Sequence, residues 1–429
     1  MPSTFLFIIA TLLLSLNFVR VAGLAVSDWF YMGALGFALL ETLTYQKKNF
    51  ICWLKNPFIP FAALICFGAL ISITNASYWE IAFIEILQQL FVITVFLSLI
   101  WILVRRGKIK LIIFAFISSG VLTACIATLD FFTGSRYGPL LSSTPNVNFW
   151  GRYAGTLGHP NKFGFFLVLT ALLTIGFWLD GLHSQKRSPL YNFSWGSIFL
   201  IQVFGVYLSN SITAYVGLMV GIFVYGNVKL AKKGLFIRMP WASPLLLLIM
   251  ILVIIIFTLP YIKTSGAYGF IQTGVERVIN TTSEGRIVVY KLAWSRILKN
   301  PLIGVGYDQI STSGINLVQS ILGTSVHNAL LEIWYTGGLF AFIGWLAIYI
   351  YLGWFAVKVI IGKVNQTPIV ISLVSAVLSA LVMDQFQDSI YQREKWLVFG
   401  LFVAWCCMQD RIRKSTLNPN INEIKIRNI

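Results

Sequence analysis

Long apolar runs dominate this chain of 429 residues and restrict what it can fold into. A helix needs about 20 mostly apolar residues to cross the hydrocarbon core of a membrane. Only 11% of the residues are charged, whereas soluble domains carry roughly 25%. Too few polar side chains remain to cover a water-exposed surface. We therefore expect an all-α, polytopic membrane protein of about twelve transmembrane helices.

The expected spans follow from reading the apolar runs in order. They are residues 5–19, 24–44, 57–76, 79–104, 109–132, 161–180, 195–209, 211–229, 243–262, 329–357, 367–386 and 395–410. Three runs, the first, seventh and last, are short for a span. The first resembles a signal peptide in position but lacks a basic segment before it, so we expect a retained helix.

The basic residues orient these spans. If both termini are cytoplasmic, most of the 32 Lys and Arg residues fall in cytoplasmic segments, and the short outer loops hold only Arg20, Arg393 and Lys395. This is the asymmetry of the positive-inside rule. The formal charge of +17 is then mainly an orientation signal, which argues against nucleic acid as a partner. The lipid bilayer is the expected surrounding, and the cytoplasmic membrane the expected location.

Two long segments fall on the outer side of this topology. Residues 133–160 separate spans five and six, and residues 263–328 separate spans nine and ten. Long connections are usually functional or disordered, and these contain ordered-looking patterns. We expect four parts: transmembrane helices in 1–262, an extracytoplasmic loop with an amphipathic helix in 263–328, three further spans in 329–410, and a cytoplasmic tail in 411–429.

Histidine is scarce, and two of the three histidines lie at outer membrane boundaries. His327 precedes Asn328 at the start of span ten. It is either a helix-entry residue bonded to the loop or a general base, since an imidazole titrates near pH ~6.5. Asn328 could orient the ring or a substrate hydroxyl. His159 and Asn161 flank Pro160, and this pattern fits a simple helix start as well as a binding role.

Arginine supplies candidates for an anion site. Arg152 precedes Gly155 and Gly158, and Arg286 opens an amphipathic stretch that runs to Lys299. A helix there could lie flat on the outer leaflet, with Ile287, Tyr290, Trp294, Ile297 and Leu298 on one face. Its first turn would then attract anions through both the helix dipole and the guanidinium. The alternative is an arginine that pairs with lipid phosphate.

Carboxylates within spans give a weaker signal. Glu332 lies just inside span ten, and Asp384 and Asp388 share one face near the outer end of span eleven. Such residues are candidates for a functional site, in which they could pair with an arginine or orient a histidine. No spacing of His, Cys or Asp suggests a metal site, and we expect neither a metal nor a cofactor.

Three segments together resemble the bacterial O-antigen ligase/polymerase superfamily. Residues 285–306, reading GRIVVYKLAWSRILKNPLIGVG, resemble its core motif, and residues 327–339, reading HNALLEIWYTGGL, resemble its second signature. Residues 151–164, reading GRYAGTLGHPNKFG, look like the motif that precedes a central helix. Twelve spans with a long loop between the ninth and tenth also match that family.

The resemblance implies a metal-independent, inverting membrane glycosyltransferase of GT-C-like architecture. Such enzymes take a glycan from undecaprenyl pyrophosphate and join it to an acceptor hydroxyl outside the cytoplasm. By this resemblance Arg152 and Arg286 bind the pyrophosphate and His327 activates the acceptor, with Asn328 in support. The residues His159, Asn161, Glu332 and Asp384 are the further candidates for substrate binding.

The acceptor is left open by the sequence. An O-antigen ligase uses lipid A-core, a polymerase uses a second lipid-linked repeat unit, and a related protein glycosylase uses Ser or Thr. The ligases often place Gly, Thr or Tyr three residues after the signature glycine, where this chain has Ala341 or Phe340. We favour the ligase. A polysaccharide transporter or flippase is the alternative from another class, although no inverted repeat is visible.

Overall fold

The computed structural model of the chain contains α-helices and almost no strand. The residues that it describes are 2–16, 20–21, 24–45, 56–134, 152–181, 188–232, 284–306, 326–362, 366–387 and 389–417. The described helices are α1 (Pro2–Leu12), α2 (Val26–Tyr45), α4 (Ile59–Ser72), α5 (Trp79–Ile93), α6 (Ile100–Arg105), α7 (Ile109–Thr133), α9 (Pro160–Gly181), α10 (Pro189–Ser209), α11 (Ile212–Lys232), α15 (Glu284–Lys299), α17 (Ala329–Ile360), α18 (Pro368–Met383) and α19 (Arg393–Leu417).

Short elements join some of these helices. A 3₁₀ turn, η1 (Ile73–Asn75), follows α4, and one π-helical stretch, η2 (Thr94–Leu99), makes α5 and α6 continuous. The strands β1 (Arg20–Val21) and β2 (Leu24–Ala25) pair antiparallel between α1 and α2. Every predicted span except 243–262, which lies outside the described residues, overlaps one of the helices.

Five described helical stretches are long and apolar enough to cross a membrane: Trp79–Val104, Ile109–Thr133, Pro160–Gly181, Ile212–Leu230 and Ala329–Ile360. Other apolar helices, such as α1 and α18, are shorter. An all-α membrane protein is therefore what the described residues support, whereas the count of twelve spans stays a prediction.

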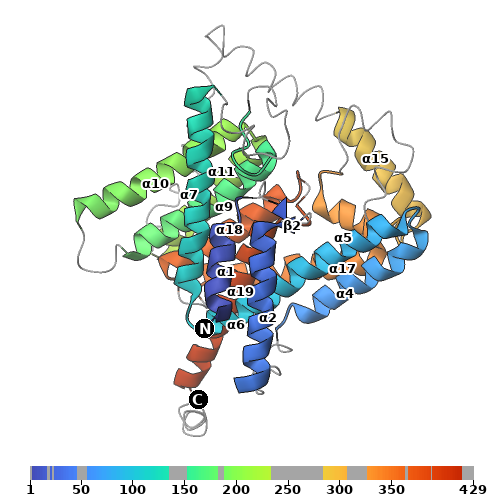
Figure 1. The fold of residues 1–429 in the computed structure, drawn as a ribbon, viewed down its shortest axis with the longest axis horizontal. Helices are drawn as coiled ribbons and strands as arrows, with labels where there is room; N and C mark the ends of the chain where they lie inside the picture. The colour runs from blue at the N-terminus through green and yellow to red at the C-terminus, as the bar shows by residue number, and fades with distance from the viewer. Residues whose placement is uncertain are drawn as a thin grey trace.

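Helix α9 lies at the centre of the packing. It contacts α7, α10, α11 and α18, and its residues from Phe163 to Leu173 are buried. A helix that is apolar all round is either packed inside a protein or in contact with lipid, and here other helices cover most of α9. Around this centre, α1 lies beside α2 and α7, while α17 packs along α4 (Figure 1).

Polar contacts mark two ends of the helix assembly. At one, which we call the Arg106 end, Arg106 pairs with Glu41 (2.7 Å) and donates to Ser3 Oγ (2.9 Å), and Lys110 pairs with Asp180 (2.7 Å). All five residues fall on the side predicted to be cytoplasmic.

At the other end, which we call the His327 end, lie the start of α2, the start of α9, the start of α17 and the connection from α18 to α19. There Arg393 pairs with Asp28 (2.7 Å), and the Thr156 hydroxyl donates to the Ser15 carbonyl (2.6 Å). The two sets of contacts agree with the side that the charge pattern assigns to each residue.

Candidate functional site

Arg152 is held where the end of α10 meets the start of α9. Its Nε donates to the carbonyl of Ser209 (2.9 Å), and its Nη2 donates to Asn161 Oδ1 (2.5 Å). The backbone N–H of Tyr153 also bonds the carbonyl of Leu208 (3.0 Å). These contacts tie the guanidinium to two helix ends and bring together two of the predicted residues, Arg152 and Asn161.

His159 begins α9. Its Nδ1 accepts the backbone N–H of Asn161 (3.1 Å), a contact of the kind that a helix-capping side chain makes. The simple helix start is thus the role that these contacts support. Burial, together with the neighbouring Arg152, Lys162 and His327, lowers the pKa of His159 to about 4. The ring is therefore neutral near pH 7, and because Nδ1 accepts a bond, its proton is on Nε2.

His327 and Asn328 form the entry to α17. His327 has φ 53°, a left-handed conformation that is uncommon for a residue with a side chain. Asn328 caps the helix by accepting from Leu331 N (2.9 Å). Its amide also donates to the carbonyl of Gln385 (3.3 Å). The helix start is fixed to the end of α18, and His327 with it.

Asp384 lies in a buried cluster behind this entry. Its carboxylate pairs with Lys395 (3.1 Å), and neither side chain is exposed to solvent. The hydroxyls of Ser389 and Tyr349 also bond it, and its carbonyl accepts Ala329 N (2.9 Å). The cluster joins α17, α18 and α19. These contacts favour a structural role for Asp384, and its substrate-binding role stays a prediction.

Two other predicted carboxylates give less information. Glu332 is half-buried in the first turn of α17, where its backbone carbonyl accepts the hydroxyl of Thr336 (2.7 Å). Asp388 lies outside the described residues.

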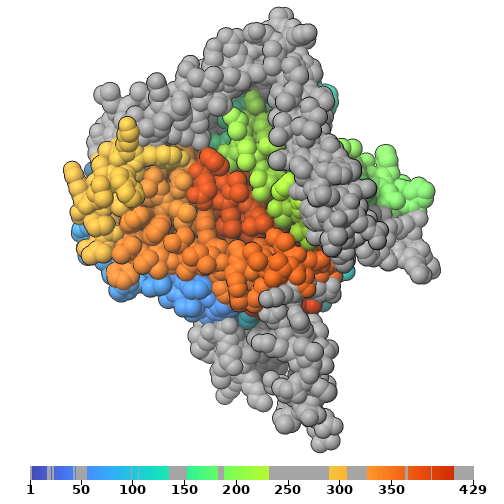
Figure 2. Space-filling view, turned by 180° about the vertical axis from the view of Figure 1, so that it is seen from behind, coloured from blue at the N-terminus to red at the C-terminus, as the bar shows by residue number. Residues whose placement is uncertain are grey.

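Arg286 lies in the first turn of α15, as predicted, although its side chain is outside the described part of the structure. The helix ends at Lys299, before Asn300 and Pro301. One side of α15 packs on α17, with Ala293 and Ile297 buried beside Tyr335. Figure 2 shows α15, in yellow, against the orange surface of α17.

Helix α17 covers only part of the predicted apolar face of α15, and the placement of that face on the outer leaflet stays a prediction. Tyr290 and Ile297 do face α17, but Trp294 is 47% exposed and Leu298 is 65% exposed. The buried face is rotated toward Ala293, because α17 presents its own side chains there and Arg296 donates to the hydroxyl of Tyr335 (3.1 Å). The part of α15 that the structure describes thus packs against a helix.

Gly304-Val305-Gly306 and Gly337-Gly338, which we call the two glycine signatures, contact each other. Helix α17 is kinked at Gly338 (φ 71°, ψ −170°), and the kink interrupts the regular backbone hydrogen bonds of the helix. The segment after α15 fills the opening: Val305 N bonds Tyr335 O (3.0 Å), Gly306 N bonds Thr336 O (3.0 Å), and Leu339 N bonds Leu302 O (3.1 Å). A Cβ on Gly304 would lie 2.6 Å from Gly338 N. Glycine is needed because the two backbones touch.

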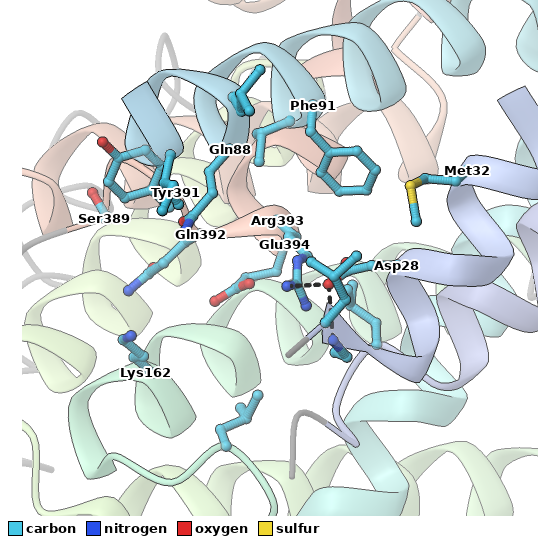
Figure 3. A pocket seen from close by; sticks show the side chains of 17 residues that line it. Asp28, Met32, Gln88, Phe91, Lys162, Ser389, Tyr391, Gln392, Arg393 and Glu394 are labelled. Atoms are coloured by element: carbon cyan, nitrogen blue, oxygen red, sulfur yellow. Dashed lines mark hydrogen bonds and ion pairs between the residues drawn. The ribbon is translucent and has the colours of Figure 1, made fainter. Parts of the chain in front are cut away.

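A cavity of about 620 Å³ lies at the His327 end and was not predicted from the sequence. Its polar lining includes Asp28, Gln88, Lys162, Gln392 and Glu394 (Figure 3). None of the eight predicted site residues lines it. Leu157 and Lys162 do, from the same motif as His159. The sequence feature that could have indicated the cavity is the pair of adjacent charges Arg393-Glu394 between two apolar runs.

Metal binding has no support in the described residues, where no group of three or more His, Cys, Asp or Glu side chains could hold an ion. The expected independence from metals stays a prediction.

Comparison with known proteins adds a family. Residues 197–346 match the family model described as O-Antigen ligase. The matched segment runs from α10 into α17 and contains Arg286, His327 and both glycine signatures, whereas Arg152 and His159 lie before it. A search of curated proteins found no match. The family match confirms the predicted resemblance to the O-antigen ligase/polymerase superfamily and indicates a membrane enzyme of ligase or polymerase type.

Proposed function

We propose that this protein transfers a glycan from undecaprenyl pyrophosphate to an acceptor hydroxyl on the outer face of the cytoplasmic membrane, as an O-antigen ligase whose acceptor is lipid A-core. One observation carries the proposal: the segment that holds Arg152 and the start of α17, far apart in the chain, come close together. Leu157 and Lys162 of that segment line one cavity with Ser389. Ser389 bonds the carboxylate of Asp384, and the Asp384 carbonyl accepts Ala329 N at the start of α17.

In the proposed reaction the acceptor oxygen attacks the anomeric carbon of the glycan. A new glycosidic bond forms, the bond from that carbon to the phosphate oxygen breaks, and the configuration inverts. Pyrophosphate is a good leaving group, so the main task is to stabilise its charge and position both substrates. Arg152, oriented by Ser209 and Asn161, and Arg286 bind the phosphates through paired N–H groups.

His327 takes the proton of the acceptor hydroxyl. His159 is neutral near pH 7, but a ring with a pKa of about 4 is a weak base, and its Nδ1 already accepts Asn161 N. The best general base has a pKa near the working pH. His159 therefore contributes by fixing the start of α9, and Asn161 by orienting Arg152.

The test compares two matched histidine variants in purified protein supplied with lipid-linked glycan and lipid A-core, without ATP or an ion gradient. His327→Asn should reduce transfer by about 10²–10⁴-fold, the usual contribution of a general base, because asparagine accepts a left-handed backbone but not a proton. His159→Asn should keep most of the activity, since asparagine is a good cap. Near-normal transfer by His327→Asn would exclude the proposed base.

The acceptor is tested in the same preparation. Extension of a lipid-linked repeat in place of lipid A-core would identify a polymerase. A lack of any transfer, together with movement of lipid-linked glycan across vesicle membranes, would instead support a flippase. Arg152→Ala and Arg286→Ala should each abolish transfer while the protein still inserts in the membrane.

A further inference from the structure

We propose that the cavity between α2, α5 and the start of α9 is a subsite for uncharged sugar residues of a glycan substrate. This inference rests on the proposed function, because it identifies where a chain of sugars lies when its end reaches His327. It adds Gln88 and Gln392, which the sequence motifs do not include.

The charges of the lining argue for a neutral ligand. Two acidic side chains, Asp28 and Glu394, face two basic ones, Lys162 and Arg393. Asp28 and Arg393 are already paired at 2.7 Å. A site for pyrophosphate needs a surplus of positive charge, and this cavity has none. The phosphates therefore belong with Arg152, outside the cavity.

The chemistry of the lining suits a carbohydrate. Gln88 and Gln392 carry amides that both donate and accept hydrogen bonds, and Ser389 and Tyr391 add hydroxyls. Phe91 belongs to the apolar part of the wall. Sugars present hydroxyls on their edges and apolar C–H groups on their faces. The amides and hydroxyls of the lining can therefore bond the sugar hydroxyls, and Phe91 can pack against the C–H groups. The volume, about 620 Å³, lies in the range of roughly 300–1,000 Å³ for small-molecule sites.

The side chains converge on one space. Figure 3 shows Lys162, Gln392 and Glu394 pointing into the cavity from two elements, α9 and the start of α19 with the residue before it. Gln88 reaches the cavity from α5 on another side. The Asp28–Arg393 pair, drawn as a dashed line, closes the wall beside α2. Three groups of hydrogen-bonding side chains thus surround one volume.

The position links the cavity to the proposed reaction. Leu157 and Lys162, which line it, stand on either side of His159. Ser389 lines it as well and also bonds Asp384, whose backbone holds the start of α17. A glycan in the cavity therefore lies next to the His327 end.

A binding measurement that needs no transfer tests the subsite. The probe is the lipid-free repeat oligosaccharide released by mild acid from the lipid-linked glycan, and its Kd is measured by saturation-transfer NMR on the whole protein in nanodiscs. The double variant Gln88→Leu/Gln392→Leu should raise the Kd about tenfold or more, as two lost hydrogen bonds imply. Gln409→Leu makes the same change in α19 away from the cavity and should leave the Kd unchanged.

A second pair of measurements separates the two proposals. His327→Asn should reduce transfer by about 10²–10⁴-fold and keep the oligosaccharide Kd. If the wild type binds the oligosaccharide through Gln88 and Gln392 but transfers no glycan, the subsite stands and the proposed function is wrong. If the wild type transfers glycan but does not bind the oligosaccharide, or if the double variant has the wild-type Kd, the subsite is wrong.

Kinetics then show which substrate supplies the sugars. The double variant should raise the KM for one substrate: the lipid-linked donor if the cavity holds donor sugars, and the acceptor if it holds acceptor sugars. Either result supports the subsite. A fall in kcat with both KM values unchanged would overturn it.

Discussion

The two ends of the helix assembly use the same kind of interaction in different surroundings. At the Arg106 end the side chains of Arg106 and Glu41 are each 16% exposed, while at the His327 end Lys395 and Asp384 are completely buried. Water screens the first pair and not the second. The difference teaches that the energetic cost of losing an ion pair depends on its burial, so the Asp384–Lys395 pair should be much more costly to break than the Arg106–Glu41 pair.

Breaking the buried pair should have the largest effect. Asp384→Ala leaves the Lys395 ammonium buried without its carboxylate, which costs about 3–5 kcal/mol. The free energy of unfolding, measured by SDS titration in mixed micelles, should fall by that amount. The double variant Asp384→Leu/Lys395→Met should recover much of the loss, because no buried charge remains. A loss below about 1 kcal/mol for Asp384→Ala would contradict the assigned burial.

The kink of α17 gives the next largest effect. In Gly338→Ala the new Cβ meets the backbone of Leu302 and Ile303, and the positive φ is strained for alanine. We expect a loss of about 2–3 kcal/mol in unfolding stability, with faster amide exchange at Val305 and Gly306. Gly353→Ala, in the same helix with open space around it, is the matched control and should be neutral or stabilising. Unchanged exchange at Val305 would show that the two signatures are not docked.

His159 adds a dependence on pH at the same end. Its pKa is about 4 in the folded protein, below the ordinary value of 6.5. Between these pH values the unfolded chain binds a proton that the folded chain does not, so stability falls as pH falls from 6.5 toward 4. We expect about 1–2 kcal/mol from this group, less than the full shift implies because the ring is not completely buried. His159→Asn should flatten that part of the stability curve, and an identical slope in both proteins would refute the assignment.

The smallest effect is expected at the Arg106 end. Arg106→Ala removes a pair that water partly screens, so unfolding stability should fall by about 1 kcal/mol or less. Adding salt should narrow the gap between variant and wild type. A loss as large as that of Asp384→Ala would remove the contrast between the ends.

Much of the helical fold could be predicted from the apolar runs, since length and hydrophobicity are local properties. The details that failed depend on neighbours. Helix α10 begins at Pro189, six residues before the predicted span, because Ser188 caps it through Tyr191 N. Lys395 reads as an outer-loop charge in the sequence, yet it is buried because Asp384, Ser389 and the ring of Trp345 surround it.

In the candidate site, too, local features could be predicted and contacts between distant parts of the chain could not. Motif spacing led to Arg152, His159 and His327, and the structure brings these residues to one end. It could not show that Asn328 is a cap bonded to Gln385, since that contact joins two separate helices. The cavity was missed because Asp28, Gln88 and Glu394 come from three distant parts of the chain and have no shared pattern.

The docking of Gly306 and the packing of Val326 have a consequence for the length of chain between them. Both residues are held against the first turns of α17, so the chain leaves this helix and returns to it at nearly one place. Closing a loop between fixed ends depends weakly on its length, about 0.6 kcal/mol for each doubling. We therefore expect a change in the number of residues between Gly306 and Val326 to cost little stability and to leave the start of α17 in place.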